Sequence, residues 1–221
     1  MTGRYENMGI KILFTTGATV TFTLLLEKII DPVFITEALL YNGVSTMILQ
    51  YGNELVNTRH GIENASERRF TETVKKSDIV EKLDLSLVQE QEGVYKYKSQ
   101  MYNDFEILAF PFISEITKII CESDLVVSHA GTGSMLDVLR LDKPLIVVVN
   151  KMLMDNHQTE VADEMQKAGV IRKVEIDEQF NSTLKNDIIN IVNGKIKLSK
   201  LWQPSKKRVQ EIIYEELGQT K

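Results

Sequence analysis

The chain has 221 residues, of which 43% are hydrophobic and 26% are charged, so it is long enough to bury a substantial core. Its net charge of −5 argues against a broad nucleic-acid footprint, and its single cysteine excludes an intramolecular disulfide. No apolar run approaches the roughly 20 residues that span a bilayer, and the start of the chain is too polar for a secretory signal. We expect a cytoplasmic protein without a transmembrane segment of its own.

Runs of aliphatic residues alternate with segments of helical spacing along most of the chain. The expected strands are 10–15, 45–50, 105–110, 125–128, 145–149 and 170–174. The expected helices are 22–30, 32–41, 114–121 and 155–168. Strands that alternate with helices and read as continuous apolar runs indicate an α/β fold with a parallel sheet covered on both faces. We predict a Rossmann-like, doubly wound, mostly parallel sheet, with ligands at the carboxyl ends of its strands.

Two segments depart from this alternation. Residues 57–100 are polar and weakly periodic, and we interpret them as a loop-rich insertion with one helix near 79–87 and one strand near 94–97. Residues 193–203 are also polar, and a helix is expected at 205–217. Most apolar helix stripes dock on their own core, but a terminal helix is well placed to contact a partner. The stripe of this helix, our candidate partner interface, consists of Val209, Ile212, Ile213 and Leu217. With these additions, residues 1–221 are read as a single domain.

The most informative stretch is Ser-His-Ala-Gly-Thr-Gly-Ser at 128–134, between a strand-like run and a helix-like run. A strand that breaks into a glycine turn and opens a helix leaves unpaired backbone N–H groups at the positive end of the helix dipole. Such groups bind phosphate or diphosphate, and small residues let the ligand approach the backbone. The candidate diphosphate-binding residues are His129, Gly131, Thr132, Gly133 and Ser134.

Three familiar phosphate or nucleophile motifs fail at specific positions. A dinucleotide fingerprint would need glycine where the chain has Leu136. A P-loop would need lysine after its last glycine, but Ser134 follows Gly133 directly. A nucleophile elbow around Ser134 would need glycine in place of Thr132 and Leu136.

A fourth pattern remains. His129, Gly131, Ser134 and Asp137, then a proline-led strand and Asp-Asn-His-Gln at 155–158, resemble the donor-binding C-terminal half of GT-B glycosyltransferases, which have two facing Rossmann domains. The segments HAGTGS, LDKPLIVVVN and MDNHQ are most similar to glycosyltransferase family 28. Within it they look like the small donor-binding subunits of the eukaryotic transferases that build dolichol-linked oligosaccharides. KILFTTGAT near the start fits as well, and the resemblance is weakest at 57–100.

The resemblance implies a role for each motif. The glycine turn would hold the diphosphate of UDP-N-acetylglucosamine, and Asp137 would bond the ribose of the uridine, although the family more often has glutamate there. The residues implied in sugar binding are Asn156, His157 and Gln158. The turn after the first strand is at the same sheet edge, and its possible cleft-lining residues are Thr16, Gly17 and Thr19.

Structural explanations exist for the same residues. Ser134 and Asp137 also fit a helix capping box, and the tetrad 155–158 fits a related cap, each worth about 1 kcal/mol. His129 taken alone would more often be a buried structural histidine.

The resemblance also implies a reaction and a partner. N-acetylglucosamine would pass from UDP-N-acetylglucosamine to N-acetylglucosaminyl-diphospho-dolichol, the second step of lipid-linked oligosaccharide assembly for N-glycosylation, on the cytosolic face of the endoplasmic reticulum. One domain of 100–200 residues supplies only half of such an enzyme, so a membrane-anchored acceptor-binding subunit would complete a hetero-complex. The chain has no Asp-x-Asp motif, and we expect no metal and no cofactor. No residue is assigned as the general base. A non-catalytic nucleotide-sugar-binding regulatory subunit, a self-sufficient transferase and a structural adaptor remain alternatives.

Overall fold

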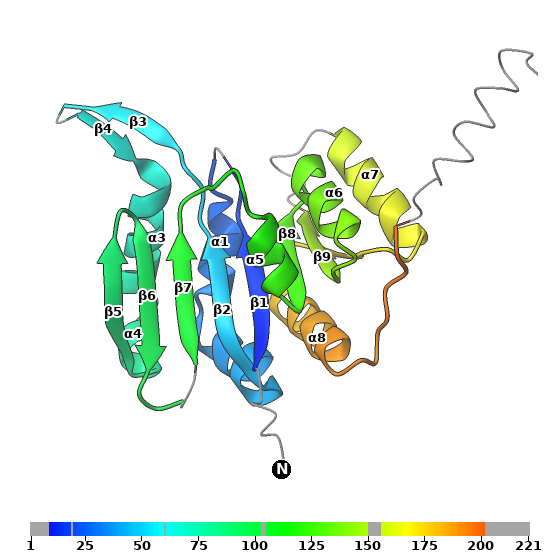
Figure 1. The fold of residues 1–221 in the computed structure, drawn as a ribbon, viewed down its shortest axis with the longest axis horizontal. Coiled ribbons are helices and arrows are strands. Elements are labelled where there is room, and N and C mark those ends of the chain that lie inside the picture. The colour runs from blue at the N-terminus through cyan, green and yellow to red at the C-terminus, as the bar shows by residue number, and fades with distance from the viewer. Residues whose placement is uncertain (1–8, 19, 60, 103–104, 150–155, 202–221) are drawn as a thin grey trace, which may run out of the picture.

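The computed structural model describes residues 9–18, 20–59, 61–102, 105–149 and 156–201, with the backbone alone for 156–158. Within them, an eight-stranded sheet runs through the molecule in the order β10-β9-β8-β1-β2-β7-β6-β5 (Figure 1). From β10 to β7 neighbouring strands are parallel, and β6 and β5 join as an antiparallel pair at one edge. The predicted Rossmann-like, mostly parallel sheet is confirmed.

The strands and helices expected from the aliphatic runs up to residue 174 are present, together with elements that the sequence did not predict. The strands of the sheet are β1 (Ile10–Thr15), β2 (Val44–Gln50), β5 (Leu85–Gln91), β6 (Val94–Ser99), β7 (Glu106–Phe110), β8 (Leu125–His129), β9 (Leu145–Val149) and β10 (Arg172–Glu175). The helices are α1 (Thr23–Ile29), α2 (Pro32–Phe34), η1 (Ile35–Leu39), η2 (Leu40–Asn42), α3 (Ala65–Lys76), α4 (Ile79–Lys82), α5 (Thr117–Glu122), α6 (Thr132–Arg140), α7 (Asn156–Lys167) and α8 (Phe180–Val192).

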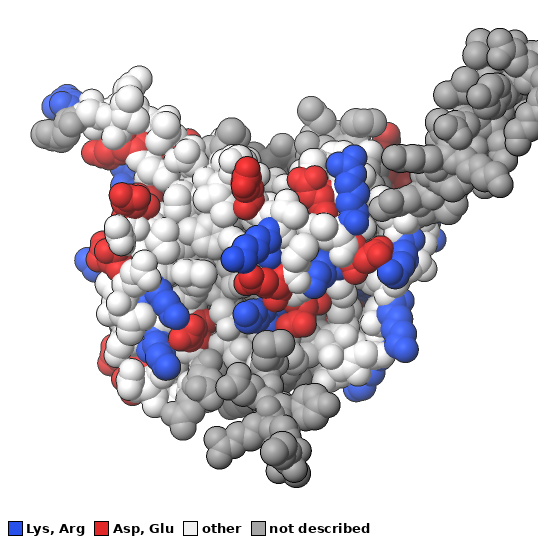
Figure 2. Space-filling view, viewed as in Figure 1, with Lys and Arg blue, Asp and Glu red and all other residues white. Residues whose placement is uncertain are grey.

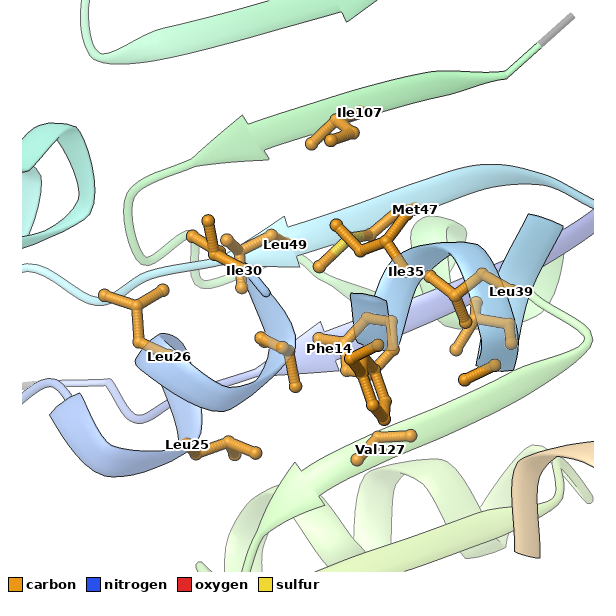
Figure 3. Close-up of a cluster of buried hydrophobic side chains, with 14 of the residues drawn as sticks. Phe14, Leu25, Leu26, Ile30, Ile35, Leu39, Met47, Leu49, Ile107 and Val127 are labelled. Carbon is orange, nitrogen blue, oxygen red and sulfur yellow. The ribbon is translucent and has the colours of Figure 1, made fainter. Parts of the chain in front are cut away.

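Each central strand contributes side chains to two cores, because successive residues of a strand point to opposite faces of the sheet. Phe14 packs with α1, η1 and α8 on one face, where Figure 3 shows it among Leu25, Ile35 and Val127. Leu13, the preceding residue, packs with α5, α6 and α7 on the other face. Helices thus cover both faces, as a parallel sheet requires.

The segment 57–100 differs from its prediction. The strand expected near 94–97 exists as β6, but the helix expected near 79–87 is only the short α4, because strand β5 begins at Leu85, and the segment is not loop-rich. It also contains α3, capped by the Asn64 side chain, and β5. A two-stranded ribbon of β3 (Leu55–Thr58) and β4 (Gly61–Asn64) precedes α3. These elements have few apolar residues, and several of those residues are buried in contacts with the rest of the protein. Phe70 of α3, for example, stacks on Tyr51 at a ring distance of 5.0 Å.

Helix α8 is not among the sequence predictions at all. Its apolar residues Phe180, Leu184 and Ile188 recur at helical spacing and are buried against the sheet. The predicted helix at 205–217, with its stripe Val209, Ile212, Ile213 and Leu217, lies outside the described residues.

Candidate functional site

The turn between β8 and α6 has the geometry of an anion-binding helix start. Gly131 is the N-cap of α6, and no side chain caps it in the described structure. The first intrahelical bond joins Met135 N–H to the Gly131 carbonyl at 3.0 Å. The amides of Thr132, Gly133 and Ser134 are therefore at the positive end of the helix dipole, where an anion is favoured.

The capping-box interpretation of Ser134 and Asp137 is wrong. Helix α6 begins at Thr132, so Ser134 lies inside its first turn and Asp137 one turn further on. Both are on the same side of the helix, because residues three apart are neighbours on a helix surface. The Asp137 carboxylate lies 3.7 Å from the Arg140 guanidinium in an exposed pair.

His129 stands at the end of β8 with its imidazole packed against the glycine turn. A Cβ on Gly131 would come within 2.6 Å of His129 Nε2, so glycine is required there by a neighbouring side chain. Burial lowers the pKa of the His129 imidazole below its ordinary value of 6.5, while a hydrogen bond with the Thr15 backbone acts in the opposite direction. The imidazole is therefore neutral near pH 7. Its Nδ1 is buried and has no hydrogen-bond partner in the described part of the chain.

A cavity opens beside this turn, between α5 and α6 and over the ends of the central strands. Ser134 and Asp137 form part of one wall, so one predicted diphosphate residue and the predicted ribose residue line the same cavity, whereas the other residues of the glycine turn are not among its lining residues. The other lining residues were not predicted from the sequence: Leu13, Thr15, Gln50, Phe112, Ile113, Ser114, Ile116, Ile120, Val126, Ser128 and Val138. A usable signal existed in Thr15, Gln50 and Ser128, polar residues that each follow an apolar run at or near the end of a strand.

The turn after β1 lies at the same sheet edge, because Thr15 pairs with Ser128 across β1 and β8. Thr16 is buried and donates from both its N–H and its hydroxyl to the Gln50 carbonyl, at 3.1 and 3.2 Å. Gly17 has a φ of +123°, a conformation that favours glycine. Thr19 lies outside the described residues.

The predicted sugar-binding residues begin the next helix along this edge. Helix α7 starts at Asn156, after β9, the neighbour of β8 in the sheet. The side chains of Asn156, His157 and Gln158 lie outside what the structure describes. Their role remains a prediction.

On the side shown in Figure 2, basic and acidic side chains alternate without forming a patch. Among the described residues, no three His, Cys, Asp or Glu side chains come together as a metal site. In the same part of the chain, none of the helices combines the length and apolarity needed to cross a bilayer.

Comparisons with known proteins give a consistent result. Residues 63–214 match the profile of the glycosyltransferase family 28 C-terminal domain. The chain is 44% identical over 209 residues to the UDP-N-acetylglucosamine transferase subunit ALG13 of Debaryomyces hansenii, covering 93% of this chain and 98% of the relative. It is 39% identical to the same subunit of Candida albicans, covering 93% and 73%.

Two solved structures share the fold. The solution structure of ALG13 superposes with a TM-score of 0.60 at 25% identity, covering 95% of this chain and 94% of that one. MurG of Acinetobacter baumannii superposes with a TM-score of 0.56 at 15% identity, covering 96% of this chain but 51% of MurG.

Proposed function

The chain belongs to glycosyltransferase family 28, and on that basis we propose that it is the donor-binding subunit of an N-acetylglucosaminyltransferase. The donor is UDP-N-acetylglucosamine, as the names of its relatives indicate for them. The acceptor is N-acetylglucosaminyl-diphospho-dolichol, so the product is an early lipid-linked oligosaccharide of N-glycosylation.

The observation that carries the proposal is the pairing of an uncapped helix start with a cavity along the same helix. The diphosphate binds the amides of Thr132, Gly133 and Ser134, where the helix dipole favours an anion. The uridine follows the helix past Ser134 to Asp137, whose carboxylate accepts hydrogen bonds from the ribose hydroxyls. The sugar then lies toward the start of α7.

The chemistry is a displacement at the anomeric carbon of the donor. The acceptor hydroxyl attacks from the face opposite the diphosphate, the new bond to the acceptor oxygen forms as the bond to the diphosphate oxygen breaks, and the acceptor proton goes to a base. Negative charge accumulates on the departing UDP. Fixed amide dipoles stabilise this charge without reorganising. No described residue is assigned as the base.

A partner subunit completes this enzyme. The relatives are named as subunits, and the chain spans about half of MurG, whose fold it shares. We propose that a membrane-anchored subunit supplies the acceptor side and holds this chain at the cytosolic face of the endoplasmic reticulum.

Donor binding is tested by titrating the chain with UDP-N-acetylglucosamine. A Cβ on Gly133 meets nothing within 4 Å, so Gly133→Ala adds a methyl group over the helix start without a clash. We expect Gly133→Ala and Ser134→Ala to weaken binding at least about tenfold, a loss of about 1.4 kcal/mol. Ser182→Ala, at an exposed position of α8, is the control and should leave affinity unchanged. Wild-type affinity in both site variants would refute the assigned site.

Transfer is tested by reconstituting the chain with its membrane partner and assaying transfer of labelled N-acetylglucosamine to the diphospho-dolichol acceptor. We expect transfer with the partner and none without it. Binding without transfer in the complex would instead support a regulatory nucleotide-sugar sensor. Transfer by the isolated chain would indicate a self-sufficient enzyme, and absence of donor binding would leave only an adaptor role.

A further inference from the structure

A row of buried polar side chains crosses the centre of the sheet at its carboxyl edge. Gln50, Thr15 and Ser128 are direct neighbours, because Thr15 pairs with Gln50 on one side and with Ser128 on the other. They are 5%, 5% and 0% exposed. Two residues earlier on the same strands and the same face, the equivalent row is apolar: Ile48, Leu13 and Val126. A sheet face that packs only against helices would continue with apolar residues, so the row calls for another explanation.

The hydrogen bonds within the row leave one group unsatisfied. Thr15 Oγ1 donates to Ser128 Oγ at 2.7 Å, and Ser128 Oγ donates to the His129 carbonyl at 2.9 Å. Gln50 Nε2 is buried and finds no hydrogen-bond partner among the described residues. A buried donor without an acceptor destabilises a protein by about 1–3 kcal/mol. Such a group is therefore a candidate for pairing with a ligand.

The row forms the floor of the cavity beside α6. One wall is apolar, with Ile113 and Ile116, and another carries Ser134 and Asp137. No lysine or arginine is among the described residues that line it. A phosphate would be poorly placed beside the Asp137 carboxylate, whose partner Arg140 is not among the lining residues, so the cavity suits a neutral ring with polar edges. The terminal torsion of a glutamine amide is soft, so a rotation of the Gln50 amide turns its N–H groups toward such a ring without backbone movement.

We propose that Gln50 is a base-binding residue: its Nε2 donates to a carbonyl oxygen of the uracil, which lies in this cavity on the Gln50–Thr15–Ser128 floor. The proposal rests on the proposed function, since it assigns the base end of the same donor. The backbone of Gln50 is fixed for this role. Its carbonyl accepts two hydrogen bonds from Thr16, and its strand is paired on both sides.

The test compares two substitutions of nearly equal size in the full chain, with UDP as the probe. Gln50→Met removes the amide and keeps its length, so UDP affinity should fall about tenfold. Because the unsatisfied donor is also gone, the midpoint of thermal unfolding without ligand should rise by about 2–4 °C. Gln50→Glu substitutes a carboxylate for the donor, so it should weaken UDP binding as strongly and lower the unfolding midpoint. Thr73→Val, which removes a buried, hydrogen-bonded hydroxyl of α3, should leave UDP affinity unchanged.

A direct readout is the side-chain amide signal of Gln50 in ¹⁵N NMR spectra, assigned by its loss in Gln50→Met. It should shift when UDP saturates the wild-type chain. If UDP binds and Ser134→Ala weakens it, but Gln50→Met binds normally and the amide signal stays in place, the base assignment is overturned while the proposed function stands. If the wild-type chain does not bind UDP, both are overturned.

Discussion

Gly131 illustrates how a single residue of the site is constrained. Its backbone has φ −75° and ψ +116°, values that any residue adopts. Glycine is needed because His129 Nε2 occupies the space that a Cβ would take. His129 is itself partly buried at the end of β8. The histidine and the glycine therefore pack as one unit. This packing fixes where the first backbone amides of α6 lie.

Gly131→Ala should disturb this unit. We expect a loss of about 1–3 kcal/mol in unfolding free energy, the range for overpacked sites, and at least about a tenfold loss of UDP affinity. Urea unfolding and UDP titration measure the two effects. Gly133→Ala provides the contrast, because alanine is favoured over glycine in a helix interior by about 0.5–1 kcal/mol. If Gly131→Ala were as stable as Gly133→Ala, the packing explanation would be incorrect.

His129 predicts a pH dependence of stability. Its folded-state pKa lies below 6.5 because the imidazole is buried, so the unfolded chain binds more protons than the folded one in the window below pH 6.5. The stability contributed by the neutral imidazole is complete above pH 6.5 and is lost as pH falls toward the folded-state pKa. In denaturant unfolding, the wild type should lose more stability between pH 7.5 and 5.5 than His129→Asn. Equal losses would contradict a buried neutral imidazole.

At the scale of elements, the parallel strands and the β8–α6 turn were predictable, because continuous aliphatic runs and a glycine turn are local signals. Most of segment 57–100 was not, because α3, β5 and β6 are largely polar and bury only a few side chains, such as Phe70, which stacks on Tyr51, and Tyr95. The capping-box interpretation placed the start of α6 three residues late. Ser134 has the chemistry of a cap, but the backbone enters the helix at Gly131 without one.

An ion pair connects helix α8 to strand β10 of the sheet, and no sequence pattern predicts it. Arg172 of β10 donates two hydrogen bonds to the buried Asp187 carboxylate of α8, at 3.1 and 2.9 Å. The two residues are 15 positions apart, and only the fold brings them together.

Arg172→Met should lower the unfolding free energy by about 3 kcal/mol, because it leaves the Asp187 carboxylate buried without its partner. Lys200→Met is the matched control. It breaks the exposed pair with Asp142, and such a pair is worth about 0–1 kcal/mol. Urea unfolding of both variants makes the comparison. Similar small losses in both would mean that the Arg172 pair contributes no more than a surface contact.

At the scale of the whole molecule, the carboxyl ends of the parallel strands β1, β8 and β9 lie at one edge of the sheet. This follows from parallel topology, so the sequence could indicate where the site lies. It could not indicate the cavity, whose floor depends on the register of three strands. One edge of one domain is the proposed donor site, and in the proposed enzyme the acceptor side comes from a partner subunit.

A crystal structure of the chain with UDP tests the central claim most directly. The account predicts diphosphate oxygens within hydrogen-bond distance of the amides of Thr132, Gly133 and Ser134, with the ribose at Asp137. A nucleotide bound at another place, with these amides facing solvent, would contradict it.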